Sequence, residues 1–330
     1  MKICKRTIAL VTAALVAITV LSSCKKDKTD VENGDSYEKK HSVVCSAFPQ
    51  YDWVRVLLGD RVSEYDIILL SGKGADMHSY QPTAEDMKDI AAADMFIYVG
   101  GVSEKWVDDV RKSVGAAKTV FVSMTEVLGS AVREEETALE AEHDGHDHGD
   151  GEPEYDEHVW LSLKNAEKIT AYIATELAKI DPDGKATYEN NLKEYLLQLA
   201  ALDAEYKKAV ENGKRDTVIF ADRFPFLYMM KDYGINYHAA STGCSAESEA
   251  SFKTITALSR AADEIKTDTV LVTETSDGAI ADAVISGMSE KGCQKTVMNS
   301  MQSVKTADAA GETYLGVMKA NLQALKKALG

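Results

Sequence analysis

Two hydrophobic periodicities alternate along most of the chain. Short runs rich in β-branched and aromatic residues, typical of buried strands, are separated by segments whose apolar residues recur at helical spacing. In the first half, the strand-like runs are Ser42–Ala47, Tyr65–Leu70, Met95–Val99 and Thr119–Ser123. The helical segments between them include Ala84–Ala92 and Glu104–Val114. Such alternation predicts a parallel sheet flanked by helices.

A second series of the same kind follows. Its strand-like runs are Thr217–Ala221, Asn236–Ala239, Thr269–Thr273 and Thr296–Asn299. Its helical segments are Ser251–Ile265, Ile280–Glu290 and a long one from about Asp308 to Leu329. Between the two series, Lys164 to about Glu211 is rich in Leu, Ala, Glu and Lys at helical spacing and is interrupted once, at Asp181–Gly184. The pattern predicts an α/β fold of two lobes with parallel sheets flanked by helices, bridged by a long helix.

A helical connector makes large movements of the lobes less favourable than a pair of flexible strands would. We therefore expect the lobes to move little relative to each other, with ligand capture depending on local loops. The expected organisation is a signal peptide at 1–23, a flexible tether at 24–40, an N-terminal lobe at 41–163, the connector at 164–212 and a C-terminal lobe at 213–330.

The first residues are typical of an export signal. A positively charged start precedes Ile8–Leu21, an apolar run of about fourteen residues that is short for a helix crossing a bilayer core of roughly 30 Å. The run ends in Leu-Ser-Ser-Cys24, which resembles the lipobox of bacterial lipoproteins. Lipid on Cys24 would anchor the exported chain to a bacterial membrane, on the periplasmic or cell-surface side. An ordinary signal peptide ending in a cysteine is the alternative. Lys25 to Lys40 is polar, as expected of a tether.

Charge excludes one class of partner. The 37 Lys and Arg residues against 53 Asp and Glu residues give a formal net charge of −16. This is the wrong sign for a protein that holds nucleic-acid phosphates, so we expect no nucleic-acid partner. An acidic surface also favours the approach of cations, although solubility alone explains many acidic proteins equally well.

Three cysteines lie outside the leader and its anchor, namely Cys45, Cys244 and Cys293. None belongs to a Cys-x-x-Cys motif, and an odd number cannot pair completely. We expect them to be small buried residues, with one disulfide possible in an exported protein. Their spacing does not favour a thiolate metal site.

Three of the seven histidines lie in one loop, at His143, His146 and His148. The loop, 134–157, contains twelve acidic residues and no Lys or Arg. This composition cannot pack a core but can bind divalent cations loosely through imidazole and carboxylate groups. The alternative is a solvated acidic loop without a ligand.

Two further histidines, His78 and His158, stand apart from that cluster. His78 follows the predicted strand Tyr65–Leu70 and a glycine-rich turn, and His158 directly follows the histidine-rich loop. Ligands of open parallel sheets bind beyond the carboxyl ends of the strands, so chemistry is expected there. Taken alone, a histidine in either place is more often a hydrogen-bonded structural residue than a metal ligand.

The segments around these two histidines carry a family resemblance. Gly-Ala-Asp-Met-His78-Ser-Tyr-Gln-Pro-Thr and Asp-Glu-His158-Val-Trp-Leu-Ser resemble the histidine motifs of zinc- and manganese-binding solute receptors of bacterial metal ABC importers. The likeness extends along almost the whole folded chain, from Phe48–Trp53 to Gly311–Leu315. It implies two α/β lobes bridged by one long helix, a metal between the lobes, and His78 and His158 as ligands.

The chain departs from this family at two positions. Members commonly add a third histidine after the first strand of the second lobe, where Ala221 or Arg223 stands here. Many also have an aspartate near the end of the chain, where Asn299–Gln302 offers no carboxylate. The remaining ligands therefore have to be sought elsewhere in the second lobe.

Three side chains are candidates to complete the site. Glu274 is the best placed, because it lies at the carboxyl end of the predicted strand Thr269–Thr273. Asp222 and His238 are possible ligands. A structural salt bridge or cap is the alternative role for each, and for Asp222 the alternative includes a pair with Arg223.

These observations predict a non-enzymatic, monomeric receptor that captures a divalent transition metal outside the cytoplasmic membrane and delivers it to an ABC permease. Zn²⁺ suits two imidazoles plus a carboxylate, and the histidine-rich loop, from which metal could pass to the main site, favours Zn²⁺ over Mn²⁺. Mn²⁺ is the main alternative, since hard cations accept carboxylates. A surface adhesin with a structural metal stays open. A secreted zinc hydrolase is disfavoured, because the sequence has no His-Glu-x-x-His or Gly-x-Ser-x-Gly motif.

Overall fold

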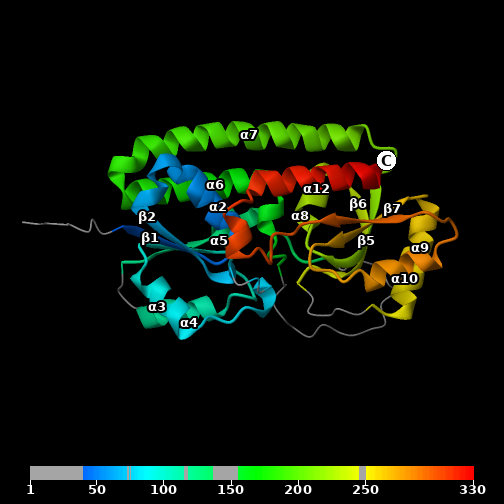
Figure 1. Ribbon diagram of the computed structural model, residues 1–330, viewed down its shortest axis with the longest axis horizontal. Coiled ribbons are helices and arrows are strands. Elements are labelled where there is room, and N and C mark those ends of the chain that lie inside the picture. The colour runs from blue at the N-terminus through cyan, green and yellow to red at the C-terminus, as the bar shows by residue number, and fades with distance from the viewer. Residues whose placement is uncertain (1–39, 73, 75, 115–117, 137–154, 245–249) are drawn as a thin grey trace, which may run out of the picture. The chain divides into compact units, whose positions relative to one another are not determined.

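Two four-stranded sheets organise the part of the chain that the computed structural model describes, residues 40–72, 74, 76–114, 118–136, 155–244 and 250–330. The strand order is β2-β1-β3-β4 in the first sheet and β6-β5-β7-β8 in the second (Figure 1). All neighbouring strands pair in parallel. The predicted α/β fold with two parallel sheets flanked by helices is confirmed.

The first sheet occupies the N-terminal half. Its strands are β1 (His41–Cys45), β2 (Tyr65–Leu69), β3 (Met95–Tyr98) and β4 (Val120–Ser123). Its helices are α2 (Phe48–Leu58), α3 (Ala84–Ala92), α4 (Trp106–Val114) and α5 (Met124–Leu128). β3 is apolar and buried at all four positions, as expected for a parallel strand covered on both faces. The four strands lie where the periodicity predicts them, to within two residues at each end.

The second sheet repeats this plan. Its strands are β5 (Thr217–Phe224), β6 (Asn236–Thr242), β7 (Thr269–Thr273) and β8 (Gln294–Met298). Its helices are α8 (Leu227–Tyr233), α9 (Phe252–Glu264), α10 (Ala279–Gly287), α11 (Thr306–Ala309) and α12 (Tyr314–Leu329). β5 and β6 each extend three residues beyond the predicted ends, and their register shifts between Phe220 and Arg223. Ala221 and Asp222 lie within this irregular part of the ladder.

Two long helices connect the sheets. α6 (Leu163–Ile180) and α7 (Lys185–Glu211) are separated by a short turn at Pro182–Gly184, where the sequence predicts an interruption. α7 runs along one side of both sheets and packs against α2, α6 and α12 (Figure 1). One buried apolar cluster contains Val43 from the first sheet, Phe220 from the second and Tyr206 from α7. Because the sheets share this core, the connector forms part of the packing.

The predicted helix from about Asp308 to Leu329 is wrong at its start. α11 ends at Ala309, and α12 begins only at Tyr314. The hydroxyl of Thr313 accepts a hydrogen bond from Gly316 N at 3.0 Å and caps α12. The buried carboxylate of Asp52, on α2, accepts a second one from Tyr314 N at 2.8 Å. The break depends on this partner, which lies 262 residues away along the chain.

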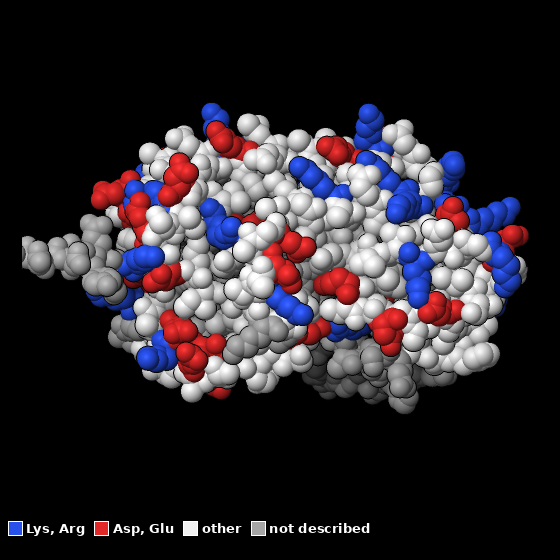
Figure 2. All heavy atoms as spheres, viewed as in Figure 1, with Lys and Arg blue, Asp and Glu red and all other residues white. Residues whose placement is uncertain are grey.

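The surface of the described residues carries charges of both signs. On the face shown in Figure 2, Lys and Arg side chains are interspersed with Asp and Glu side chains, without the continuous basic stripe that binds nucleic-acid backbones. Within the described ranges, no helix combines the length and the apolar character needed to span a bilayer.

Candidate metal centre

The backbone of each motif histidine is held by the same kind of local hydrogen bond. His78 lies in a single helical turn, Met77–Ser79, and Asp76 Oδ1 accepts a hydrogen bond from His78 N at 3.0 Å. His158 directly precedes a similar turn, Val159–Leu161, and Asp156 Oδ1 accepts a hydrogen bond from His158 N at 2.8 Å. In both segments an aspartate two positions before the histidine fixes its backbone. The shared Asp-x-His spacing is therefore a local signal that the sequence itself carries.

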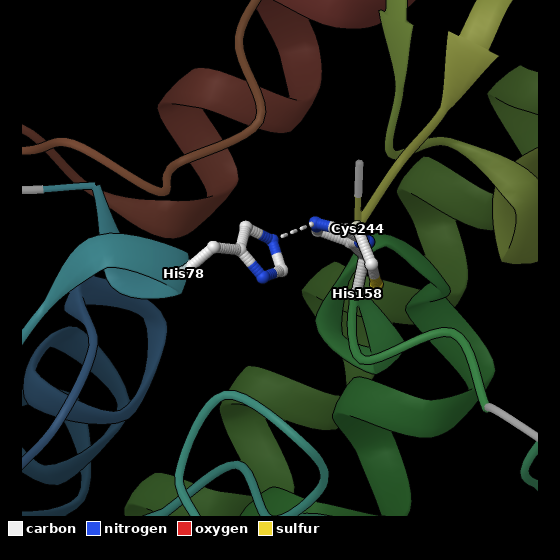
Figure 3. Close-up of side chains that lie close together, drawn as sticks. All are labelled: His78, His158 and Cys244. Atoms are coloured by element: carbon white, nitrogen blue, oxygen red, sulfur yellow. Dashed lines mark hydrogen bonds between the residues drawn. The ribbon is translucent and has the colours of Figure 1, made fainter. Parts of the chain in front are cut away.

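The fold brings these two histidines together from positions 80 residues apart. His78 Nε2 lies 3.1 Å from His158 Nε2, and the rings point toward each other (Figure 3). The His78 side chain is 9% exposed and the His158 side chain is completely buried. Two imidazoles that converge in a nearly dry environment form the start of a metal site.

The other ring nitrogens face oxygen atoms. His158 Nδ1 lies 3.0 Å from Asp156 Oδ1; because a carboxylate oxygen only accepts, the tautomer that donates from Nδ1 to Asp156 leaves a lone pair on Nε2. His78 Nδ1 lies 2.7 Å from Ser103 Oγ and 3.5 Å from Glu157 Oε2. When His78 Nδ1–H donates to Ser103 Oγ, its Nε2 also presents a lone pair. Two lone pairs that face each other repel unless a cation lies between them, and carboxylates behind histidines are typical of metal sites.

The carboxylate of Glu157 is only partly satisfied. Its Oε1 accepts a hydrogen bond from Ser103 N at 2.8 Å, whereas Oε2 is buried without a hydrogen-bond partner. A buried carboxylate oxygen without a donor is costly, and a cation nearby would compensate for it. The surroundings of His78 therefore favour a positive charge.

The charge state of His78 also suits metal binding. Burial lowers the pKa of His78 to about 3, and the proximity of His158 and Arg223 acts in the same direction. Burial alone would raise the pKa of Asp76, but the hydrogen bonds from Arg223 and from His78 N outweigh it and lower that pKa. His78 is thus neutral at neutral pH, which is the form that binds a metal.

A third potential ligand comes from the second lobe. Ligand atoms of His78, His158 and Cys244 all lie within 4.8 Å of one another, and this is the one such group of His, Cys, Asp or Glu among the described residues. Figure 3 shows the thiol of Cys244 beside the His158 ring. The sequence spacing had not favoured a thiolate site, and the approach of Cys244 is decided by the position of β6. Burial raises the pKa of this thiol, with Asp156 and Glu135 acting in the same direction.

The end of β6 reaches His158 because residue 243 is glycine. A Cβ at Gly243 would lie 2.7 Å from Phe224 O and 3.0 Å from His158 Cε1, so no side chain fits between them. Cys244 N donates to Glu135 Oε1 at 2.9 Å. The backbone beside the thiol is therefore fixed from two sides.

The predicted carboxylate ligand has other partners. Glu274 lies just after β7, outside the three-residue group, and its two oxygens accept hydrogen bonds from Ser300 N at 2.8 Å and Ser300 Oγ at 2.7 Å. In this structure the side chain holds the loop after β8. Its ligation stays a prediction.

The two further candidates also lie outside the group. Asp222 Oδ2 accepts hydrogen bonds from Thr273 N at 2.9 Å and Thr273 Oγ1 at 2.7 Å, which join β5 to β7. The predicted pair between Asp222 and Arg223 is wrong at the side chains, because the Arg223 guanidinium binds Asp76 Oδ2 at 2.6 Å. His238 lies within β6, opposite Ile219 in the ladder.

The three cysteines outside the leader and its anchor are unpaired, and both ends of the histidine-rich loop are described. Cys45, Cys244 and Cys293 are free, so the possible disulfide among them is not formed. His143, His146 and His148 lie outside the described residues. The base of their loop is described: Glu134 pairs with Tyr155, one residue before Asp156. The loop therefore begins and ends beside the histidine pair.

Comparisons with known proteins identify the family of this chain. Residues 43–328 match the family described as zinc-uptake complex component A, periplasmic. The chain is 31% identical over 311 residues to the high-affinity zinc uptake system protein ZnuA of Bacillus subtilis (strain 168), covering 94% of each. It is 30% identical over 325 residues to the zinc-binding lipoprotein AdcA of Streptococcus pneumoniae serotype 4, a match that covers 98% of this chain and 61% of AdcA.

Solved structures give the same result for the fold. The metal-dependent lipoprotein YcdH of Bacillus subtilis superposes with a TM-score of 0.70 and 29% identity, over 88% of this chain and 99% of that one. The Zn(II)-bound AdcA of Streptococcus pneumoniae superposes with a TM-score of 0.69 and 28% identity, over 88% of this chain and 58% of that one.

Proposed function

The chain belongs to the family of zinc-uptake complex component A proteins, and on that premise we propose that it captures Zn²⁺ outside the cytoplasmic membrane and delivers it to an ABC permease. The family consists of transport receptors rather than enzymes. The sequence-based prediction of a metal importer's solute receptor is thus confirmed at the level of the family, and the cargo and the permease are the proposal.

The facing pair of histidines is the observation that supports this function. Two nitrogens bound to one tetrahedral Zn²⁺ at about 2.0–2.1 Å are roughly 3.3 Å apart. His78 Nε2 and His158 Nε2 are 3.1 Å apart, so binding requires a change of only a few tenths of an ångström. The carboxylates of Asp156 and Glu157 behind the rings supply the negative charge that a dication needs.

The second lobe has to supply the rest of the coordination sphere. Glu274 stays the predicted carboxylate ligand, and its binding would require it to exchange at least one hydrogen bond from Ser300 for the metal. Asp222 and His238 were possible ligands from the sequence, but their places on β5 and β6 add no support.

We also propose that lipid on Cys24 anchors the receptor to the membrane. Supporting this are the Leu-Ser-Ser-Cys24 motif and the relative named a zinc-binding lipoprotein. Residues 1–39 lie outside the described part of the chain. Replacing Cys24 by serine should release the processed protein from the membrane fraction, whereas continued membrane association would refute lipidation.

Metal analysis of the purified processed protein tests the cargo and the site together. We expect one tightly bound zinc per chain, lost in His78→Ala and in His158→Ala and retained in the matched control His41→Ala. His41 begins β1 and lies near Asp94, away from the pair. His78→Ala and His158→Ala should also fail to restore zinc uptake in a deletion strain at limiting zinc, whereas His41→Ala should restore it.

The outcomes separate the alternatives. Full zinc content in both histidine variants would refute the site. Preferential retention of Mn²⁺ when both metals are offered would favour the manganese receptor. If the purified protein binds zinc normally but the deletion strain shows no defect in zinc uptake, the adhesin with a structural metal would be favoured.

A further inference from the structure

We infer that the thiolate of Cys244 is a third ligand of the cargo metal and makes the site selective for zinc over manganese. The inference rests on the proposed function, because it needs the histidine pair to bind a metal. It adds a sulfur donor where the sequence analysis expected only nitrogen and oxygen.

The distances suit a mixed site. With Zn–N near 2.0–2.1 Å and Zn–S near 2.3 Å, a nitrogen and a sulfur on one tetrahedral zinc are roughly 3.6 Å apart. The ligand atoms of His78, His158 and Cys244 already lie within 4.8 Å of one another. Closure of the thiol toward the rings by about 1.2 Å at most completes three of the four positions.

Cys244 differs from the other two described cysteines in its surroundings. Cys45 lies in the main apolar core, and Cys293 packs against the apolar cluster behind the second sheet. Both are explained as small hydrophobic residues. Cys244 belongs to none of the apolar clusters of the described residues and lies beside a buried imidazole instead. A thiol beside two imidazoles is a metal-binding combination.

The backbone around Cys244 is arranged for this approach. Gly243 lets the strand end touch the His158 ring, and the bond from Cys244 N to Glu135 holds the next peptide. Since Glu135 lies at the start of the histidine-rich loop, this hydrogen bond also joins the backbone of Cys244 to that loop. The carboxylates of Glu135, Asp156 and Glu157 make the surroundings negative and favourable for a cation.

Ala221 and Arg223, near the end of β5, do not compete with Cys244 for this position. Ala221 has no ligand atom, and the guanidinium of Arg223 is occupied by Asp76. The thiolate therefore supplies the donor from the second lobe that the end of β5 lacks. Glu274 stays the predicted fourth ligand.

A sulfur ligand has a chemical consequence. Thiolates bind zinc well and the hard cation Mn²⁺ poorly. On binding, the S–H bond of Cys244 breaks, an S–Zn bond forms, and one proton leaves to solvent. The site should therefore discriminate against manganese more strongly than histidine and carboxylate ligands alone would allow.

Cobalt substitution tests the sulfur bond directly. The processed protein, loaded with one equivalent of Co²⁺, should show a sulfur-to-cobalt charge-transfer band in the near ultraviolet. The band should persist in the control Cys293→Ser, another free and partly exposed cysteine, and disappear in Cys244→Ser. Zinc affinity measured against a competing chelator should fall in Cys244→Ser by more than the roughly 10–100-fold typical of losing a residue that only orients a ligand. Cys244→His, which restores a nitrogen donor, should recover most of this loss but discriminate less against Mn²⁺.

Thiol labelling keeps the test informative if Cys244→Ser does not fold. In the unmodified protein, zinc should protect Cys244 from alkylation while labelling of Cys293 stays the same. Stoichiometric cobalt without a charge-transfer band, or labelling of Cys244 unaffected by zinc, would overturn the inference. Either result would leave the proposed function intact provided that His78→Ala and His158→Ala still lose zinc. If both histidine variants instead keep their zinc, the proposed function is refuted.

Discussion

Gly243→Ala is the smallest change expected to disturb the metal centre. The added Cβ would lie 2.7 Å from Phe224 O and 3.0 Å from His158 Cε1, whereas ordinary contacts begin at 3.4 Å. The strand end must therefore move by several tenths of an ångström, away from a backbone oxygen that cannot turn aside. Metal–ligand distances are tolerated only within about 0.2 Å, so the thiol of Cys244 and the ring of His158 should no longer reach one ion together.

Two effects of different size follow from this displacement. Overpacking of this kind destabilises folded proteins by about 1–3 kcal/mol, which should appear as a lower midpoint of urea unfolding. Zinc affinity, measured by chelator competition at a temperature where the variant is folded, should fall by at least tenfold, which corresponds to about 1.4 kcal/mol. Gly311→Ala is the matched control, because its nearest contact is Asp308 O at 3.8 Å. A folded Gly243→Ala protein with unchanged zinc affinity would refute this account of the strand end.

Three further predictions concern residues around the site and in the core. Burial raises the pKa of Asp52 from 3.8 to about 6, so the stabilisation by its protonated form is complete below pH 3.8 and is lost as the pH rises through 6. Asp52→Asn keeps an acceptor for Tyr314 N and removes the charge, so it should raise the free energy of unfolding above pH 6 by up to about 3 kcal/mol. Asp222→Ala should cost about 1–3 kcal/mol by leaving Thr273 without its partner, while zinc content stays at one per chain. Deleting residues 142–150 should reduce uptake at limiting zinc and leave binding at the main centre intact.

Each of these predictions has a contradicting result. Equal pH dependence of the unfolding free energy in Asp52→Asn and the unmodified protein would remove the assigned role of Asp52. Loss of zinc from a stable Asp222→Ala protein would make Asp222 a ligand after all. Unchanged uptake at limiting zinc after the loop deletion would exclude a relay of metal from the histidine-rich loop.

The strands and much of the site could be predicted because their signals are local. A parallel strand buried on both faces needs consecutive apolar residues, and β3 and the Val-Leu-Val centre of β7 satisfy this. His78 and His158 could be selected from the sequence because the segments around them resemble the family's histidine motifs, and the structure adds that an aspartate two positions before each fixes its backbone. The family resemblance implied that the two rings meet, and the folded structure supplied the distance between them.

The amino-acid sequence by itself determined the alternation of strands and helices, the two motif histidines and the family. Only the tertiary structure decided that Cys244 joins the histidines, that Glu274 is held by Ser300, and that Arg223 pairs with Asp76. The physical reason is range: hydrophobic periodicity and caps act over a few residues of chain. Partners across the lobes depend on strand register, and the shift within β5 or the missing side chain of Gly243 redirects a group without leaving a periodic trace in the sequence.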